Sequence, residues 1–476
     1  MSSAPAWLGL DLGTSGVRAL AVSADGRVLG RGDRRVESRR DGPRHEQSPE
    51  DWWDAVGGAT HDALDELSAD RVRGLAVCGT SGTILLVDPR NGAPLTPGLM
   101  YDDARAAAQA DRFGAPTSWA LSKLLWLVDH DPELAAAGRL AHQPDFITRR
   151  LAGAPVPTDS SHALKTGYDL AAEEWPRRVT DALPGGLLPE VVRPGTILGS
   201  VCPAAAAHTG LAPGTPIVAG MTDGCAAQIA AGALGVGDWS SVLGTTLVIK
   251  GVTEASLDDP AHGLYSHRAP DGEWLPGGAS SAGAGALEAA FPGRDLDALT
   301  RAAAPHAETR VIAYPLAGRG ERFPFRAPDA EGFVVGEPAG DAELFAALLQ
   351  GLAFVERLCF DVLDHRGAPI DGELTLTGRA AANRRLSQLR ADVLGRPVRL
   401  VDHGESAFGM AILAASPRRR LADVAASMVR ARDRFEPRPA ETDRLAARYA
   451  EFVGELVRRG WLDPEVAGRA LGRPRC

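Results

Sequence analysis

Two short turns of small polar residues end apolar stretches that lie far apart in the chain. The first is Thr-Ser-Gly at residues 14–16, just after the carboxylate of Asp11, and the second is Gly-Thr-Thr at residues 244–246. Backbone N–H groups and hydroxyls in such turns suit phosphate oxygens, and glycine lets the backbone approach closely. A carboxylate beside phosphate needs a cation, and Mg²⁺ is held by one or two carboxylates. The predicted phosphate contacts are Thr14, Ser15, Gly244, Thr245 and Thr246, with Asp11 as metal ligand.

A second carboxylate, Asp223, follows the apolar segment 215–220 and precedes a stretch of small residues. Carboxylates at the carboxyl end of a strand face clefts in α/β folds. Such a group can take the proton of a hydroxyl that attacks a phosphate. Simpler structural interpretations stay open: each turn can be an ordinary hairpin, Asp11 a buried hydrogen-bonded acid, and Asp223 the N-cap of the next helix.

The elements expected to carry the first turn are short strands at residues 7–12, 18–23 and 27–31. Asp25-Gly26 precedes the third strand, because this pair tolerates the positive φ of a tight hairpin. An antiparallel start argues against a dinucleotide-binding unit, in which a helix follows the first Gly-rich turn. The chain also lacks a G-x-x-x-x-G-K-[ST] segment, so any ATP site must be of another kind.

The same order of strand, small polar turn and strand returns at residues 238–252. Two related α/β domains, each offering a turn to a shared cleft, account for this repeat, although one short repeat can also arise by chance. A further strand, predicted at residues 373–377, runs into Gly378, which leaves room for a flat ring or a ribose. A plain loop between a strand and a helix explains that glycine equally well.

Composition limits the class of partner. A chain of 476 residues is longer than a single hydrophobic core usually supports, so two domains are expected. Its 51 basic and 61 acidic residues give a net charge of −10. This charge disfavours nucleic acid and anionic membranes and favours a small-molecule partner. The 5 scattered cysteines, with no signal peptide and no apolar run of about 18 residues, predict a cytoplasmic protein. The Arg- and Glu-rich tail, residues 418–476, is predicted to be a solvated helical cap.

Taken in order, several segments resemble the FGGY family of carbohydrate kinases. They match its two phosphate motifs, its first signature, its Gly-x-x-Asp segment with the general base, and its Gly-Glu-Arg-x-Pro motif. The first signature departs at Ala120, where Pro, Ser or Thr is usual. In chain order these segments are 9–15, 118–130, 221–223, 241–246 and 320–324.

The resemblance implies an α/β, two-domain, actin-like ATPase (ribonuclease H-like) fold with a central cleft. Residues 1–233 would form the sugar-binding and catalytic domain, and residues 234–476 the nucleotide-binding domain with its helical tail. ATP and Mg²⁺ are the implied cofactors, and Asp223 is the implied catalytic base. The implied sugar contacts are Asp11, Ser81, Asp103 and Asp223, and the implied further nucleotide contacts are Gly378 and Asn383.

Two departures from the family pattern bear on the ligands. The adenosine motif opens with three glycines in the family and with Gly378-Arg379-Ala380 here. Arg379 can stack on adenine or reach a phosphate, or it can crowd the pocket. Xylulokinases have Gln-Met-His-Gly where this chain has Gly-Thr-Ser-Gly at residues 79–82, so Ser81 replaces the histidine that touches the ketose. This turn, with segments 100–105 and 163–169, resembles the short D-ribulose kinase subgroup.

The resulting hypothesis is an ATP-dependent sugar kinase, monomeric or homodimeric, that phosphorylates the terminal hydroxyl of a ketopentose. D-ribulose is the expected substrate and D-ribulose 5-phosphate the product. The nearest alternative is a kinase of D-xylulose or of a related ketose or polyol. An alternative from another class is an actin-like protein that binds nucleotide or sugar with little catalysis.

Overall fold

The opening residues form the antiparallel strands that their apolar pattern predicts. In this computed structural model, which describes residues 4–259 and 262–472, β1 (Ala6–Gly13) pairs with β2 (Gly16–Ser23). Strand β2 then pairs with β3 (Val28–Arg35) after a turn in which Gly26 has a φ of 80°. The predicted hairpin that carries the first polar turn is therefore confirmed.

A six-stranded sheet grows from this hairpin, in the order β12-β13-β6-β1-β2-β3. Strand β6 runs parallel to β1, β13 runs parallel to β6, and β12 closes the edge in the antiparallel direction. Parallel neighbours end at the same edge of a sheet, so the carboxyl ends of β1, β6 and β13 lie together. The added strands are β6 (Val72–Gly79), β13 (Pro216–Val218) and β12 (Ile197–Ser200).

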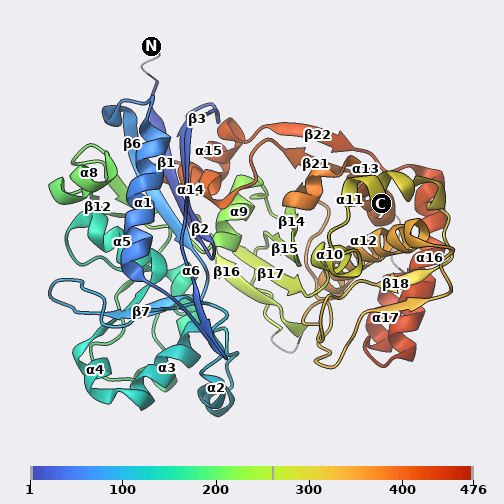
Figure 1. Cartoon of the computed structure of the whole chain (residues 1–476), viewed down its shortest axis with the longest axis horizontal. Coiled ribbons are helices and arrows are strands. Elements are labelled where there is room, and N and C mark those ends of the chain that lie inside the picture. Colours follow the sequence, from blue (N-terminus) through green and yellow to red (C-terminus); the bar gives the residue numbers. More distant parts are fainter. Residues whose placement is uncertain (1–3, 260–261, 473–476) are drawn as a thin grey trace. The chain divides into compact units, whose positions relative to one another are not determined.

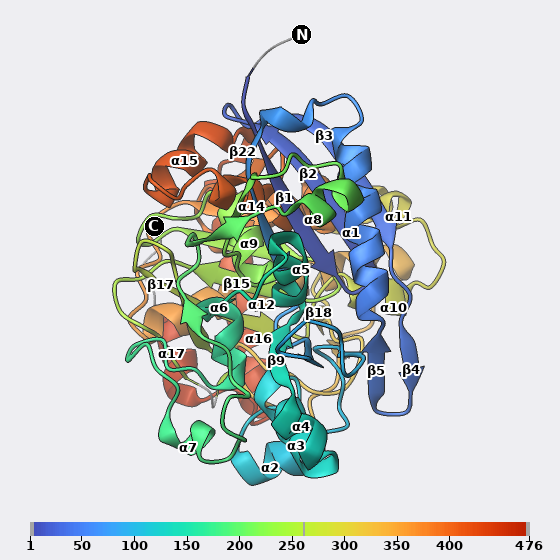
Figure 2. The same ribbon diagram turned by 90° about the vertical axis from the view of Figure 1, so that its left-hand side faces the viewer.

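Helices cover both faces of this sheet. Helix α1 (Pro49–Leu64) begins where Ser48 accepts a hydrogen bond from Asp51 N at 3.3 Å, and it packs on β2 and β3 (Figure 2). Helix α14 (Ser406–Ala414) is apolar on all sides and packs on β1 and β6. Successive residues of a strand face opposite sides, so Gly9 faces α14 while its neighbour Leu8 joins the core cluster that includes Trp52 of α1.

The chain folds into two compact units, and each contains segments from both halves of the sequence. The first unit runs to Gly232 and also contains His267–Gly272 and His403–Val429. Accordingly α14 and α15 (Leu421–Met428), orange in Figure 1, lie with the blue and green elements of this unit. The division at residues 233 and 234 stays a prediction, and the contact-based units differ from it by these two segments.

The second unit is built on a seven-stranded sheet in the order β16-β17-β15-β14-β20-β21-β22. Its centre repeats the first sheet: β14-β15-β17 is an antiparallel meander, and β20 and β21 continue in parallel from β14. An antiparallel strand, β22, closes that edge as β12 closes the other sheet. Its strands are β14 (Trp239–Leu243), β15 (Leu247–Gly251), β16 (Tyr265–Arg268), β17 (Trp274–Ser280), β20 (Leu374–Thr377), β21 (Val398–Val401) and β22 (Ala431–Phe435).

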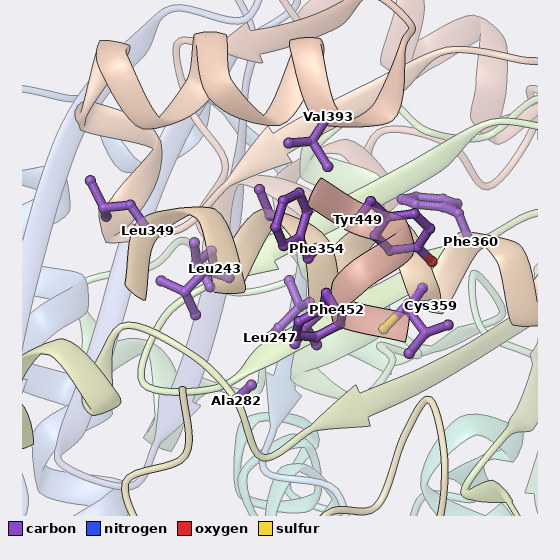
Figure 3. Close-up of a cluster of buried hydrophobic side chains, with 14 of the residues drawn as sticks. Leu243, Leu247, Ala282, Leu349, Phe354, Cys359, Phe360, Val393, Tyr449 and Phe452 are labelled. Carbon is purple, nitrogen blue, oxygen red and sulfur yellow. The ribbon is translucent and has the colours of Figure 1, made fainter. Parts of the chain in front are cut away.

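Most of the tail packs in the core of the second unit, whereas α15 belongs to the first unit, and the prediction of a solvated cap is wrong. Helix α16 (Pro439–Arg458) inserts Tyr449 and Phe452 against Phe354 of α12 (Asp341–His365), as Figure 3 shows. Strand β22 also comes from the tail. The described part of the tail is mostly helical, as predicted, but one face of α16 is apolar and buried; Cys476 lies outside the described residues.

Residues 104–152 are mostly helical, with one short strand among the helices. Strand β9 (Arg139–His142) interrupts them and pairs with β7 (Ile84–Val87) in a five-stranded sheet of the order β4-β5-β8-β7-β9. The strand has only four residues, too few for a periodic signal. The other elements of this sheet and its surroundings are β4 (Arg39–Asp41), β5 (Arg44–Gln47), β8 (Gly98–Leu99), α2 (Ala107–Phe113), α3 (Ala120–His130), α4 (Pro132–Ala137) and α5 (Gln143–Ala152).

The remaining elements are short, and the two longest are helices α13 (Arg384–Leu394) and α17 (Pro464–Gly472) of the second unit. In the described parts of the chain, none of the helices has the length and apolar character needed to cross a membrane. The elements are β10 (Thr158–Asp159), α6 (Ser160–Ala163), α7 (Arg177–Thr180), β11 (Val191–Val192), α8 (Pro203–Thr209), α9 (Asp223–Ala230), α10 (Gly285–Ala290), α11 (Leu296–Ala302), β18 (Ile312–Tyr314), β19 (Phe333–Val335), α13 (Arg384–Leu394) and α17 (Pro464–Gly472).

The contact between β1 and α14 gives a prediction about stability. A Cβ placed on Gly9 would lie 1.7 Å from the carbonyl oxygen of Ala407, which is backbone and cannot rotate away. We expect Gly9→Ala to cost about 3 kcal/mol and to lower Tm by roughly 6–12 °C. Gly185→Ala is the matched control, since its Cβ meets nothing within 4 Å. Equal Tm values for the two variants in a thermal scan would contradict this packing.

Candidate active site

The carboxyl ends of three parallel strands bring the two predicted carboxylates to one edge of the first sheet. Asp11 pairs with Cys78 of β6, and Gly79, the next residue of β6, bridges to Thr222. Thr222 directly precedes Asp223, the first residue of α9. The register therefore gathers Asp11, the turn that begins at Gly79, and Asp223 at this edge.

The charge of Asp223 influences the ionisation of Asp11. Burial raises the pKa of Asp11 to about 6, the negative charge of Asp223 adds to the shift, and a hydrogen bond from the Cys78 thiol (3.5 Å) opposes it. Asp223 accepts a hydrogen bond from Gly224 N at 2.8 Å, and its carbonyl accepts one from Ser406 Oγ at 3.1 Å. The first residue of α9 is thus fixed at both its side chain and its backbone.

The negative charge of Asp223 acting on the buried Asp11 favours a cation or a proton at this pair. In the parts of the chain that the structure describes, no group of three or more His, Cys, Asp or Glu side chains could hold a metal ion. A divalent ion at Asp11 would therefore complete its shell with phosphate oxygens and water, which is how Mg²⁺ is commonly held. A single protein carboxylate fits an ion that is also bound by phosphate and water better than a metal site built from protein ligands alone.

The turn after β1 is held from outside the hairpin. Gln47 Nε2 donates to the carbonyl of Thr14 at 2.6 Å, and Ser15, at the tip, is exposed. Tyr101 hydrogen-bonds the Thr14 side chain, while burial and the charges of Asp102 and Asp223 raise the pKa of its phenol. Tyr101 therefore belongs to this site, although its sequence context gave it no role.

The turn at residues 79–82 presents a polar atom that the described part of the fold does not use. Among the described residues, the buried Ser81 Oγ has no hydrogen-bond partner, whereas the Ser81 carbonyl accepts a hydrogen bond from Lys165 Nζ at 3.2 Å. A buried hydroxyl without a partner costs about 1–3 kcal/mol, so it is rarely left that way without a ligand or water. This agrees with the expectation that Ser81 meets the sugar.

Asp103, the other predicted sugar contact, is fully occupied within the fold. Its carboxylate accepts two bonds from the Arg105 guanidinium at 2.9 and 2.7 Å, and further bonds from the backbone N–H groups of His45 and Arg105. Asp103 is completely buried. Four bonds use the acceptor positions of a carboxylate. In this structure Asp103 therefore shapes the loop, and its direct contact with sugar stays a prediction.

The segment that resembles the first family signature holds this loop in place. Lys123, buried in α3, directs its ammonium group at the carbonyl oxygens of residues 101, 117, 118 and 119, at 3.1–3.5 Å. Trp126, three residues on, stacks under the Arg105 guanidinium at 5.0 Å. The lysine and tryptophan of the signature thus fasten the segment that carries Tyr101 and Asp103 to α3.

The second polar turn is braced in the same way within the second unit. Gly244 N donates to the Thr246 carbonyl at 3.0 Å, and the carbonyls of Gly244 and Thr245 accept bonds from Ala284 N and Gly285 N. A Cβ on Gly283 would lie 2.2 Å from the Thr245 carbonyl oxygen, so only glycine fits there. Thr245 itself is exposed, as a phosphate contact requires.

The motif at residues 320–324 supports this brace. Glu321 is buried and accepts hydrogen bonds from Ser280 Oγ and Tyr314 Oη at 2.8 and 2.7 Å, and from Ser281 N at 2.6 Å. Ser280 ends β17 and leads into the segment that contacts the turn at residues 244–246. The acid of this motif thus positions the turn at residues 244–246 through its neighbours.

The predicted adenosine segment lies beside the same turn. Gly378 has a φ of 86°, and a Cβ there would lie 2.7 Å from the Leu243 carbonyl oxygen. Arg379 is exposed, and its effect on the nucleotide stays open. Asn383 caps α13 by accepting from Leu386 N at 3.0 Å and donates to Thr300 Oγ1 at 2.9 Å. Both ends of its amide are engaged, so its contact with nucleotide also stays a prediction.

The buried ammonium group of Lys123 predicts a pH-dependent stability. Burial, helped by the charge of Lys165, lowers its pKa from 10.5 to about 7. Between pH 10.5 and about pH 7, the Lys123 side chain holds its proton in the unfolded chain but loses it in the folded one. The free energy of unfolding therefore rises with pH over this range. Relative to Lys123→Met, the wild-type Tm should rise by roughly 4–8 °C between about pH 7 and 9. A Tm difference that stays constant over this range would contradict the shift.

Comparison with known proteins extends the likeness over most of the chain. Residues 6–119 and 111–230 match the model of the N-terminal domain of the FGGY family of carbohydrate kinases, and residues 240–417 match that of its C-terminal domain. The solved structure of xylulose kinase from Rhodospirillum rubrum superposes with a TM-score of 0.84 at 26% identity, covering 96% of this chain and 99% of that one.

Two curated relatives agree with this result. A xylulose kinase of Escherichia coli (strain K12) is 28% identical over 475 residues, which span 94% of this chain and 96% of the relative. A xylulose kinase of Streptomyces coelicolor is 32% identical over 295 residues, which span 57% of this chain and 59% of the relative. The chain therefore belongs to the FGGY family of carbohydrate kinases, is a sugar kinase, and has that family's two-domain, actin-like α/β fold.

Proposed function

We propose that this sugar kinase transfers the γ-phosphoryl group of ATP to the terminal hydroxyl of a ketopentose, with D-xylulose as the first candidate. The observation that carries the proposal is the pair Asp11 and Asp223 at one sheet edge beside the turn of Ser81. The product would be D-xylulose 5-phosphate. As the bond between the sugar oxygen and the γ-phosphorus forms, ADP leaves and the hydroxyl loses its proton, which an acceptor in the site must take.

Asp223 is the proposed acceptor of that proton. Two hydrogen bonds fix the position of this residue: Gly224 N donates to the Asp223 carboxylate, and Ser406 Oγ donates to the Asp223 carbonyl. The negative charge of Asp223, together with burial, raises the pKa of the neighbouring Asp11 to about 6. A carboxylate in that setting orients the hydroxyl and takes its proton as the bond to phosphorus forms.

The phosphate groups of ATP would be met by the turns that begin at Thr14 and Gly244. Their exposed tips, Ser15 and Thr245, offer hydroxyl and backbone N–H donors. Asp11 would hold Mg²⁺ together with phosphate oxygens, and the ion would neutralise charge on the transferred group. The proposed adenosine position lies at Gly378, with Thr377 and the exposed Arg379 beside it in the chain. The buried Thr377 hydroxyl has no hydrogen-bond partner in the described parts of the chain.

The choice of sugar rests on two observations that point in different directions. The names of the relatives favour D-xylulose, which corrects the preference for D-ribulose drawn from the sequence. The residue at the sugar turn favours D-ribulose, because Ser81 stands where xylulokinases have histidine. D-Ribulose is therefore retained as the second candidate. Family membership disfavours the other alternative, a binding protein with little catalysis.

The decisive experiment measures ADP release by the full chain with ATP, Mg²⁺ and a panel of ketoses and polyols. We expect the highest kcat/KM with D-xylulose. A higher value with D-ribulose would establish the second candidate, and no turnover with any ketopentose would contradict the proposal.

Asp223→Asn is the matched variant in the same assay, because it keeps the size of the side chain and removes the proton acceptor. We expect kcat to fall by about 10²–10⁴-fold, the usual contribution of a positioned base, with little change in Tm. A variant that turns over as fast as the wild type would exclude Asp223 as the base.

Gly283 gives a prediction about the nucleotide. Because its Cβ would strike the Thr245 carbonyl, Gly283→Ala should displace the second phosphate turn. We expect kcat/KM for ATP to fall by about 10–100-fold, since small misplacements of reacting groups cost rate steeply. Gly318→Ala, whose Cβ meets nothing within 4 Å, is the control. Equal kcat/KM for ATP in both variants would show that the brace does not position the phosphate.

A further inference from the structure

We propose that Gln143 is a sugar-binding residue, whose amide Nε2 donates a hydrogen bond to an oxygen of the ketose beside Ser81 Oγ. The inference rests on the proposed function and adds a specificity-determining residue to it. Gln143 was not among the candidates from the sequence.

The orientation of the Gln143 amide follows from its contacts. Its Oε1 accepts hydrogen bonds from the backbone N–H and the hydroxyl of Thr80, both at 3.1 Å. A backbone N–H can only donate, so the atom that faces Thr80 must be the amide oxygen. The Nε2 group, with two hydrogens to donate, therefore points elsewhere.

That Nε2 group is buried and has no partner among the residues that the structure describes. Gln143 is 0% exposed, and its Nε2 makes no hydrogen bond to any of them. Leaving a buried amide donor unpaired costs about 1–3 kcal/mol, and native proteins keep few of them. The neighbouring backbone is satisfied, since Gln143 N donates to the Thr83 carbonyl at 3.2 Å. The unused donor is thus a feature of the side chain alone.

The position of Gln143 links this donor to the sugar. It is the first residue of α5 and follows β9, whose pairing with β7 brings it to the turn of Gly79 and Thr80. Gly79 bridges to Thr222, the residue before the proposed base. A Cβ on Gly79 would lie 2.9 Å from Gln143 Oε1, so the glycine gives the amide room against the turn.

The chemistry of the two unpartnered atoms suits a sugar. Ser81 Oγ can donate and accept, and Gln143 Nε2 can only donate. A ketose offers hydroxyls that do both and a carbonyl oxygen that only accepts. Two neutral groups of this kind are poor partners for phosphate, which favours charged or backbone donors. Recognition by buried polar groups rejects analogues that lack the matching oxygen, because the protein donor is then left unpaired.

The test compares wild type, Gln143→Met and Gln143→Glu with D-xylulose and D-ribulose as probes, in the kinase assay and by calorimetric titration. Methionine keeps the volume and removes the donor; glutamate keeps an oxygen for Thr80 and serves if the first variant does not fold. We expect kcat/KM for the preferred sugar to fall by about tenfold, mainly through KM, with ATP hydrolysis in the absence of sugar unchanged. Gln109→Met, a buried glutamine bonded to Asp129, is the control and should match the wild type.

Deoxy analogues of the preferred sugar separate recognition from a purely structural role. If Nε2 binds one oxygen, wild type and Gln143→Met should differ by less than about twofold with the analogue that lacks this oxygen, and by about tenfold with the others. An equal loss with every analogue, or no loss with the parent sugar, would overturn the inference and leave the proposed function intact. If the wild type neither binds nor phosphorylates a ketopentose, both fail together.

Discussion

The site depends on two carboxylates being held at one edge of a sheet although their charges repel. Burial and Asp223 together raise the pKa of Asp11 to about 6, so the ionised pair is costly until a cation or a proton compensates it. The register of β1, β6 and the residue before α9 fixes this arrangement. Because a one-residue slip would turn Asp11 to the opposite face, the hydrophobic alternation of β1 also determines the chemistry.

Most of the charged residues near the proposed ligands support loops and do not face a ligand. Lys123 gathers four carbonyl oxygens, Asp103 is held by Arg105, and Glu321 accepts bonds from the segment behind the second phosphate turn. Buried charges are tolerated when they are paired and fully hydrogen-bonded, and then they fix a geometry firmly. Two of the family motifs thus owe their residue types to positioning, while the contacts with ligand fall to turns and small side chains.

The sequence predicted the parts of the site that depend on local patterns. Strands around Asp11 and around the turn at Gly244 follow from alternation and turn residues, and the order of the motifs indicated two domains. It could not predict β9, because a four-residue strand has no periodicity of its own and forms by pairing with β7. It also misjudged α16, since its polar face dominates the composition while Tyr449 and Phe452 lie in the core. Whether Asp103 or Asn383 is free for a ligand depends on tertiary contacts.

The polar atoms that the fold leaves unused are therefore more informative than the conspicuous charges. Asp103 has the chemistry of a sugar ligand but no acceptor to spare, whereas Ser81 Oγ and Gln143 Nε2 are modest groups with capacity left over. Burying an unpaired donor opposes folding, so it persists where binding recovers the cost. Both atoms border a turn whose position depends on β9. Strand β9, which could not be predicted from the sequence, is thus the element that brings a second hydrogen-bond donor to the proposed sugar.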